Sequence, residues 1–426
     1  MTTLATVGFG LLFFALLMAS VALHEVGHMV PAKLFGVRVP KYFVGFGRTL
    51  WSTTRGGTEY GVKLFPLGGF VQLLGMYPPA DPAAPPTRLT RFADDVRSVE
   101  WDEIAASDRG HLLYEKPVWQ KVVVMAGGIT MNLLIAFGLL WGVVGLHGVV
   151  RPQTTVASVS QCLVTEQRAE KACLPTDELT PAWQAGLQAG DRIVSFNGTP
   201  IADQRQLTDL IRANLDREAT LVVERGGATV TLPTVRTRIT PVADRLDPSR
   251  AVSAGWLGFS PVYARVTGGP GDVLGDLRDM TEASVVALAQ FPVKVWNVAA
   301  DMVAGRPRDI YGPISVFGAS AIAGEVATQD VGVADRAAMF ASLLASINLF
   351  LALFNLVPLP PLDGGHIVGA LYEGAKRGIF RLLGRPDPGH VDTARMVPVA
   401  YAVGAFLLLS GVVLIVADIV SPMKLF

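Results

Sequence analysis

Long uncharged stretches alternate with polar segments along this chain. Four stretches lack charged side chains over roughly the 20 residues that a helix needs to cross the apolar core of a bilayer. They are Met1–Leu23, Val122–Leu146, Ala337–Leu362 and Met396–Ala417. The pattern predicts a polytopic α-helical membrane protein with four transmembrane helices.

The first apolar stretch has a second interpretation as a signal peptide. Ser20-Val21-Ala22 resembles a small-x-small cleavage site. However, no Lys or Arg precedes the apolar run, as a signal peptide would require. We therefore expect this stretch to remain as the first transmembrane helix.

Composition agrees with a membrane protein. Hydrophobic residues make up 50% of the 426 residues and charged residues only 17%, whereas soluble domains average about 25% charged residues. The 36 basic and 36 acidic side chains cancel, so net charge gives no indication of a nucleic-acid partner. The two cysteines, Cys162 and Cys173, could form one disulfide in an oxidising compartment.

Basic residues beside the apolar stretches predict the orientation in the cell (inner) membrane. Five of them follow the third stretch, namely Lys376, Arg377, Arg381, Arg385 and Arg395, and Lys116 and Lys121 precede the second. By contrast, the first three residues carry no basic side chain and the C-terminal tail carries only Lys424. We expect residues 31–121 and 363–395 in the cytoplasm, with both termini and residues 147–336 outside.

The segments between the helices contain further predicted elements. Two strand-like runs flank Gly56-Gly57, which predicts a β-hairpin over residues 42–74. Residues 78–110 are rich in Pro, Ala, Asp and Arg and are expected to be a loosely ordered connection with little chemistry. In the external segment, a strand over Arg192–Phe196 and an amphipathic helix over Gln204–Asn214 predict a small α+β domain.

The predicted division of the chain has eight parts. It comprises helix 1 at 1–30, a cytoplasmic hairpin and loop at 31–115, helix 2 at 116–148, an external domain at 149–240, a linker with an amphipathic helix at 241–335, helix 3 at 336–362, a cytoplasmic loop at 363–395 and helix 4 at 396–420. The sequence assigns no role to the 241–335 segment.

Metal-binding chemistry is indicated at the end of the first apolar stretch. His24-Glu25-Val26-Gly27-His28 has the H-E-x-x-H spacing, which places both imidazoles on one face of a helix, one turn apart. Glu25 can then act as the general base towards a zinc-bound water. Three ionisable residues within five positions of a membrane helix are costly to keep for packing alone, so they predict a functional site.

A catalytic zinc site normally has a third protein ligand and leaves one position for water. Asp363, at the end of the third apolar stretch, is the best candidate. Stretches one and three cross the membrane in the same direction, so their C-terminal ends emerge at the same face, where the second stretch begins. His24, His28 and Asp363 are thus expected to meet at the cytoplasmic side.

Several motifs together resemble the site-2 protease family of intramembrane zinc metalloproteases. They are HEVGH, GGITMN, YGPISVFG and NLVPLPPLDGG, and AGLQAGDRIVSFNGTPI between the second and third resembles a PDZ domain of bacterial proteases. The overall order is similar to the actinobacterial, PDZ-containing members that act in regulated intramembrane proteolysis. Only one PDZ-like segment is evident, whereas the best-known enterobacterial members have two.

The resemblance implies roles for individual residues. It implies one Zn²⁺ per chain held by His24, His28 and Asp363, with Glu25 as general base. Asn132, Asn355 and Pro358 are implied at the substrate site, although either asparagine could instead satisfy a helix contact. Pro358 and Pro360 should also unwind the end of helix 3 and free Asp363 to turn towards the metal. The hairpin is implied to present a strand edge to substrate, or else to be a structural cover.

Four other histidines and the external domain are also interpreted. His366, one turn past Asp363, is expected near the ligands but not among them, and His111, His147 and His390 are expected to be bystanders. The PDZ-like domain is implied to bind extended peptide ends, with a simple spacer as the alternative. Asp191 and Asn197 are expected to have structural roles within it.

The combined prediction is a four-span membrane protein with a membrane-associated β-hairpin and an inserted extracytoplasmic PDZ domain. We expect a zinc endopeptidase that cleaves single-pass transmembrane proteins such as anti-sigma factors, after a first external cut. Its expected partners are these substrates, membrane lipid and a peptide ligand of the PDZ domain, with no nucleic acid. The alternatives are a zinc transporter and a non-catalytic PDZ scaffold.

Overall fold

The uncharged stretches form long helices in the structure, a computed structural model that describes residues 2–80, 87–163 and 172–423. Two units divide the chain: residues 1–143 with 270–426 make a helical unit, and residues 144–269 make a second unit. In the helical unit, the long helices are α1 (Thr2–Leu34), α3 (Val118–Trp141), α6 (Pro270–Ala304), α8 (Val333–Leu356), α9 (Asp363–Leu382) and α10 (Val397–Val420). Helix α3 continues into the π-helix η3 (Gly142–His147).

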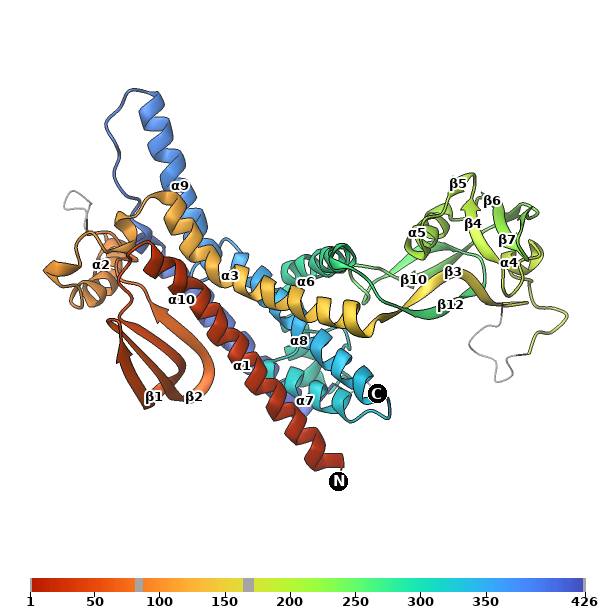
Figure 1. Ribbon diagram of the computed structural model, residues 1–426, viewed down its shortest axis with the longest axis horizontal. Coiled ribbons are helices and arrows are strands. Elements are labelled where there is room, and N and C mark those ends of the chain that lie inside the picture. The colour runs from red at the N-terminus through yellow and green to blue at the C-terminus, as the bar shows by residue number, and fades with distance from the viewer. Residues whose placement is uncertain (1, 81–86, 164–171, 424–426) are drawn as a thin grey trace. The chain divides into compact units, whose positions relative to one another are not determined.

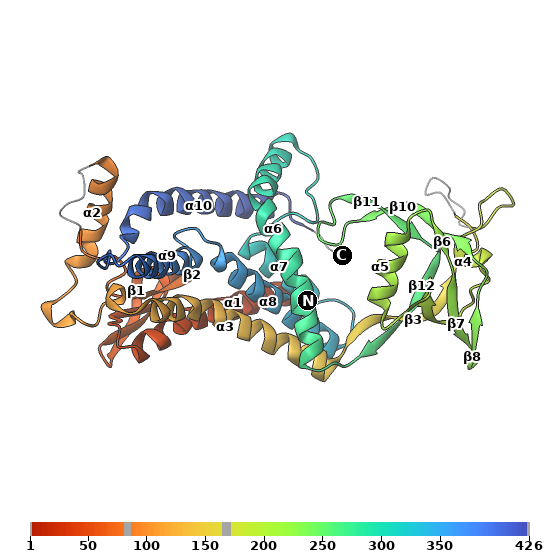
Figure 2. The same cartoon turned by 90° about the horizontal axis from the view of Figure 1, so that it is seen from above.

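Close helix contacts hold the helical unit together. Figures 1 and 2 show α1 and α3 side by side, and α3 also packs on α8. The short helix α7 (Val316–Ala327) packs closely against α1. The close approach requires a glycine at position 324, because a Cβ there would lie 2.3 Å from the carbonyl oxygen of Thr6. Phe13 and Leu17 of α1 and Ala323 of α7 are buried in one apolar core. Small residues permit this close packing, as is common between membrane helices.

Five helices of the described chain are long and apolar enough to cross a membrane, one more than the sequence predicts. The additional helix is α6, the least apolar of the five. It packs on α10 through Val295, Val298, Leu414 and Ala417. In Figures 1 and 2, α6 runs across α1, α3 and α10 rather than alongside them.

Two segments predicted to be loops are helical. Residues 78–110 include α2 (Arg88–Trp101), which the high proline and charge content of the segment obscured. Helix α2 docks on the start of α10, where Arg97 and Asp392 form a buried ion pair at 2.6 Å. Residues 363–395 begin with the 20-residue helix α9. Its Glu373 carboxylate lies 2.8 Å from the Lys121 ammonium of α3, so the basic segment is anchored rather than loose. The short 3₁₀-helices are η1 (Ala106–Asp108), η2 (Leu113–Glu115) and η4 (Thr393–Met396).

The predicted hairpin consists of β1 (Lys41–Arg55) and β2 (Thr58–Gln72), joined at Gly56-Gly57. The sheet is more folded than a simple hairpin. Residues 41–44 pair both with residues 59–62 and with residues 69–72. The final segment of β2 therefore lies at an edge of the sheet, next to α1.

The second unit contains a twisted sheet in the strand order β12-β3-β4-β7-β8, with β5 paired to β4. Its elements are β3 (Val149–Val159), α4 (Pro181–Gln184), β4 (Arg192–Phe196), β5 (Thr199–Pro200), α5 (Gln204–Asn214), β6 (Glu218–Ala219), β7 (Leu221–Arg225), β8 (Ala228–Thr231), β9 (Val235–Arg236), β10 (Arg238–Ala243), β11 (Ala251–Trp256) and β12 (Phe259–Val266). β4 and α5 have the predicted bounds. Ile193, Phe196, Leu207 and Leu221 lie in its buried core.

The predicted domain boundary at residue 240 is wrong. β12 returns to pair with β3, which extends the unit to residue 269. A sequence pattern cannot reveal that pairing, because the two strands are separated by about 100 residues of other elements. Cys162 and Cys173 form a disulfide in this unit.

Asp191, expected to be structural, is a buried ionic contact of the second unit. Its side chain is 1% exposed, and it receives hydrogen bonds from Arg225 Nε at 2.7 Å and Arg225 Nη2 at 2.7 Å. It also accepts one from the Gln188 amide at 2.8 Å. The hydrogen bonds from Arg225 hold the pKa of Asp191 below its usual range.

We predict that Asp191→Asn lowers the stability of the second unit by about 1.5–3 kcal/mol near neutral pH, the usual size of hydrogen bonds to a charged group. Because the folded-state pKa of Asp191 is depressed, its contribution is present above the unfolded pKa of about 3.9 and declines as pH falls through the folded value. In thermal unfolding of the full chain, the wild type should therefore be more stable than Asp191→Asn near neutral pH, and this difference in stability should decrease in acid.

Asp216→Asn is the matched control. Asp216 pairs with Arg236 at 3.4 Å, but both side chains are more than half exposed, and such pairs contribute little. An equal loss of stability in both variants, or a difference that does not depend on pH, would contradict the assignment.

Candidate metal centre

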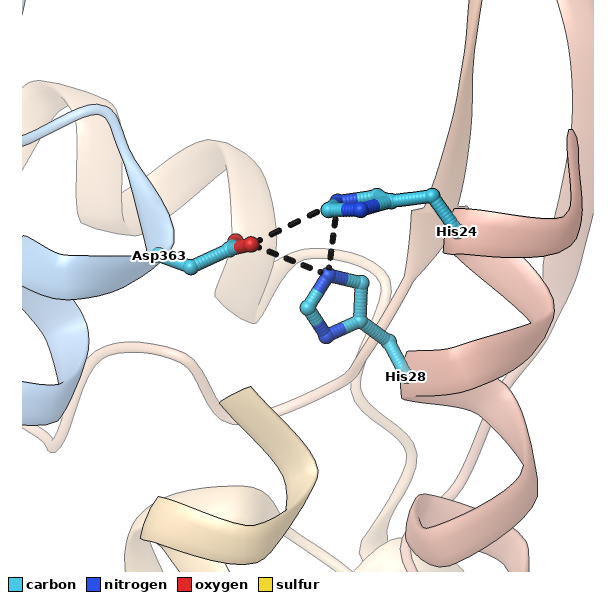
Figure 3. A group of neighbouring side chains, drawn as sticks. All are labelled: His24, His28 and Asp363. Carbon is cyan, nitrogen blue, oxygen red and sulfur yellow. Dashed lines mark hydrogen bonds and ion pairs between the residues drawn. The ribbon is translucent and has the colours of Figure 1, made fainter. Parts of the chain in front are cut away.

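Three side chains from opposite ends of the chain converge at one point in the helical unit (Figure 3). His24 and His28 project from successive turns of α1, with their Nε2 atoms 3.2 Å apart. Oδ2 of Asp363, the first residue of α9, lies 3.4 Å from Nε2 of His24 and 3.3 Å from Nε2 of His28. Tetrahedral zinc ligands at 2.0–2.1 Å from the ion would lie about 3.3 Å from one another. The three atoms therefore match the spacing of a zinc site.

The protonation states of these groups also fit a cation. His28 Nδ1 lies 2.8 Å from the carbonyl oxygen of Val124, so it donates its proton there. This leaves Nε2 of His28 as an acceptor, the arrangement typical of a metal-bound histidine. Asp363 Oδ2 is buried and has no hydrogen-bond donor among the described residues. A cation between this oxygen and Nε2 of the two histidines would satisfy all three buried acceptors.

The glycines of α3 make room for the cluster. A Cβ at Gly128 would lie 2.3 Å from His28 Nε2 and 2.7 Å from His24 Nε2. A Cβ at Gly127 would lie 2.0 Å from the Gly27 carbonyl oxygen. Any larger side chain would thus push α3 away from α1 or fill the place between the imidazoles.

Asp363 reaches the histidines because α8 ends early. The helix stops at Leu356, seven residues before Asp363 and two before Pro358. The chain then turns, and α9 begins at Asp363 itself. Burial alone would raise the pKa of Asp363, but the two imidazoles outweigh it and lower that pKa. The helix end agrees with the predicted effect of the prolines.

Glu25 faces the same site and is held by the β-sheet. Its Oε2 accepts a hydrogen bond from the backbone amide of Val71 at 3.0 Å. Val71 lies on the final segment of β2, at the edge of the sheet. Gly69, two residues earlier on this segment, lies beside the Glu25 side chain, because a Cβ there would be in van der Waals contact with Glu25 Cγ at 3.4 Å. The sheet therefore orients the carboxylate relative to the two histidines beside it.

A cavity of about 620 Å³ opens onto the cluster, within the range of enzyme ligand sites. Its walls include the three converging side chains and Glu25, together with Phe70, Val71, Gln72, Leu73, Met76, Tyr77, Glu100, Met125, Asn355, Pro361 and His366. The lining combines ionisable and polar groups around the cluster with apolar side chains from β2, α3 and the chain that leaves β2. Such a space can hold an extended peptide segment next to the metal position.

Of the other predicted site residues, some line this cavity and some do not. Asn355 lines the cavity and donates a hydrogen bond to the Leu351 carbonyl oxygen at 3.1 Å. Asn132 lies on α3, one turn beyond Gly128; it is buried and does not line this cavity. Pro358 lines a neighbouring apolar cavity instead. His366 lines the cavity but is not part of the ligand cluster, and burial lowers its pKa.

Glu100 was not predicted to be near the site. It comes from α2, in the segment expected to have little chemistry. Its carboxylate accepts hydrogen bonds from the amides of Met76 at 2.7 Å and Tyr77 at 3.3 Å, which hold the chain that leaves β2. Burial raises the pKa of Glu100. Apolar residues at helical spacing, Phe92, Val96 and Val99, were the signal for this helix.

All three expected bystanders have partners. His390 Nδ1 lies 3.2 Å from a carboxylate oxygen of Glu373, and His111 Nδ1 lies 2.8 Å from the Gly36 carbonyl oxygen. Both contacts are outside the cavity. His147 contacts Arg265.

Comparison with known proteins agrees with this site. The model of peptidase family M50 matches residues 12–382. Zinc metalloprotease Rip1 of Mycolicibacterium smegmatis is 35% identical, over 98% of this chain and 99% of the relative. Rip1 of Mycobacterium tuberculosis is 33% identical over 98% of each chain. The regulator of sigma E protease of Salmonella typhi is 27% identical over 84% of this chain and 89% of the relative.

The family match spans both halves of the metal cluster, His24 and His28 at one end and Asp363 at the other. The full-length similarity to named zinc metalloproteases accounts for the ligand spacing, the adjacent carboxylate and the apolar helices. The chain therefore belongs to peptidase family M50, the site-2 protease family, and is an integral membrane zinc metalloprotease.

Proposed function

We propose that this protein cleaves single-pass transmembrane proteins, such as anti-sigma factors, after a first cut outside the cell. The observation that carries the proposal is the metal cluster beside Glu25, at the ends of helices long enough to span a bilayer and open to a cavity. A relative named as a regulator of sigma E protease supports this choice of substrate class.

In this proposal, different residues carry out metal binding, proton transfer and substrate contact. His24, His28 and Asp363 would hold the zinc ion, which when bound lowers the pKa of a water and polarises the scissile carbonyl. Glu25, held by the Val71 amide, takes the proton of the attacking water and delivers it to the leaving amine nitrogen. Asn355 lines the cavity, and its side-chain amide would contact the substrate backbone in exchange for its hydrogen bond to the Leu351 carbonyl oxygen of its own helix.

The sheet edge next to Glu25 suggests how the substrate binds. A transmembrane helix must be extended before its peptide bonds can be attacked, and an edge strand supplies the hydrogen bonds that the helix gives up. The final segment of β2 is such an edge and lies beside the metal cluster. The substrate segment would therefore bind along residues 69–73, inside the cavity.

The position of the cluster favours four membrane crossings, with its active site towards the cytoplasm. His24 near the end of α1 meets Asp363 just after α8, so these two helices end on the same side. Helix α3 starts on that side and therefore ends on the opposite side, which is also where α8 starts. The number of crossings between the end of α3 and the start of α8 must then be even. Helix α7 has 12 residues, about 18 Å, and is too short to cross the apolar core. Helix α6 would then remain at one face, with the second unit outside.

We propose that the second unit is a PDZ-type domain that limits or selects substrates. Its antiparallel sheet and helix α5 are in keeping with the PDZ-like sequence, and the disulfide suits an oxidising compartment. Peptide binding by strand addition is the usual mode of such domains.

The first test is Glu25→Gln in purified protein. We expect zinc content to stay near one ion per chain, because the metal ligands remain, while cleavage of a model transmembrane peptide falls about 10²- to 10⁴-fold. Metal content is measured by mass spectrometry and cleavage in lipid vesicles. A zinc transporter would instead keep zinc flux into vesicles in this variant, and a scaffold would show no cleavage in the wild type.

The second test concerns the third ligand. Asp363→Asn should weaken zinc binding by more than about 100-fold. Even the loss of a group that only hydrogen-bonds to a metal ligand lowers metal affinity by about 10- to 100-fold. His366→Gln is the matched control, because His366 lines the same cavity without belonging to the cluster. Competition with a zinc chelator measures both affinities. Equal affinity in the Asp363 variant and the wild type would exclude Asp363 as a ligand.

The third test concerns topology. The only cysteines are joined in a disulfide, so single cysteines can be introduced at Thr267 before α6 and at Ala304 at its end. Both should react with a membrane-impermeant thiol reagent in intact cells, because α6 does not cross. Arg385→Cys should react only after permeabilisation. Reaction of the two positions from opposite sides would overturn the four-span arrangement.

A further inference from the structure

Helix α9 and the start of α10 enclose two adjoining cavities next to the cavity that opens onto the metal cluster, and the first of them shares Tyr77, Pro361 and His366 with that cavity. The first, which we call the apolar cavity, has a volume of about 280 Å³ and is lined mainly by Pro358, Pro360, Val368, Tyr372, Met396 and Ala400. The second, the basic cavity, has a volume of about 460 Å³ and is lined by Tyr372, Lys376, His390, Asp392 and Arg395 among others. Tyr372, Val391, Asp392 and Arg395 line both, so the two form one continuous groove.

On both walls of the groove, the lining residues change from apolar at one end to basic at the other. On α9, Val368, Tyr372 and Lys376 lie one turn apart on one face, apolar first and basic last. On the opposite wall, Ala400 and Met396 line the apolar cavity and Arg395 reaches the basic one. The apolar end lies along α10, a helix able to span a membrane. The basic end lies where that helix begins.

Among the described residues, the positive charge at the basic end is only partly neutralised. Lys376 makes no ion pair or hydrogen bond with any residue that the structure describes. Asp392, the one carboxylate lining the basic cavity, is already paired with the buried Arg97 at 2.6 Å as well as with Arg395 at 3.3 Å. His390 is held by Glu373, which itself pairs with Lys121. An anion in the basic cavity would thus face two cations with little opposing charge.

The apolar end is also incompletely covered by protein. Val368 is 48% exposed, Tyr372 60% and Met396 49%. These side chains surround a cavity at the foot of a membrane-spanning helix, where the natural covering is hydrocarbon. Basic pockets between helices at the cytoplasmic side commonly bind phospholipid head groups.

We propose that this groove binds one anionic phospholipid, with its phosphate between Lys376 and Arg395 and an acyl chain in the apolar cavity. A free phosphate would leave the apolar cavity unfilled, and a neutral lipid would leave Lys376 without an anionic partner among the described residues and Arg395 with only its shared contact to Asp392. The bound lipid packs against Pro361, Gly365 and His366, which belong to the turn that carries Asp363. The lipid therefore supports the segment that presents the third metal ligand.

The test is lipid titration of the purified full-length protein, followed by native mass spectrometry. Phosphatidylglycerol should bind as one tight equivalent, and phosphatidylcholine with the same acyl chains should bind more weakly. Glycerol phosphate, which has the anion without the chains, should not bind at the same concentration. The double variant Lys376→Gln/Arg395→Gln should weaken phosphatidylglycerol binding about 10- to 30-fold, given about 1 kcal/mol for each basic residue near a lipid surface.

The matched control is Arg381→Gln/Arg385→Gln, which removes two positive charges at and just beyond the end of α9 without altering the groove lining. It should bind phosphatidylglycerol like the wild type. Ala400→Trp is a second variant that fills the apolar cavity while keeping both cations, and it should also lose the tight lipid.

Four results would overturn the proposal. The first three are equal binding of the two lipids, equal effects of the two double variants, and glycerol phosphate binding as tightly as the lipid. The fourth is protection of Ala400→Cys from thiol labelling by a substrate peptide but not by lipid, which would assign the groove to substrate. These readouts measure binding alone, so they do not depend on the proposed substrate of the protease.

Discussion

Mutual repulsion between buried hydrogen-bond acceptors is the constraint on which this structure depends. Two imidazole nitrogens and a carboxylate oxygen lie within 3.4 Å of one another, and the proton of His28 Nδ1 is directed away, to Val124. Without a cation, such an arrangement would be costly in a low-dielectric interior. A zinc ion held by these three groups would join α1 to the turn between α8 and α9, so that metal binding and helix packing would stabilise each other.

The same constraint explains the small residues around the site. The imidazoles project into a space that only glycines at positions 127 and 128 leave open. The close approach also brings Val124 near enough to orient His28. Helix α3 thus contributes no ligand and yet determines both the space for the ion and the tautomer of one ligand.

The segment between α1 and α3 orients Glu25 and the chain beside it through backbone groups. The Val71 amide holds Glu25, and Glu100 in turn holds the amides of Met76 and Tyr77. This chain of contacts links α2, the end of β2 and α1. A base held in this way is oriented before substrate arrives, which lowers the cost of reaching a reactive geometry.

How much of this could be read from the sequence depends on the range of the interactions involved. The H-E-x-x-H spacing, the apolar stretches, the Gly56-Gly57 turn and the prolines after Leu356 act within a few residues, and their predicted consequences appear in the structure. Asp363 could be paired with the histidines because crossing direction is itself a sequence property. Helices α2 and α9 were missed because their charged and proline-rich composition resembles that of loops, whereas burial against α10 and α3 stabilises them.

The sequence by itself determined the family, the ligand types and the membrane character, since these follow from residue identity and short periodic patterns. Only the tertiary structure decided which groups surround the ligands: the Val71 amide on Glu25, Glu100 beside the cavity, the return of β12 to β3, and the groove between α9 and α10. These contacts join backbone groups and surfaces far apart in the chain. Because every amino acid except proline offers the same backbone N–H, no residue pattern records where that amide will donate its hydrogen bond.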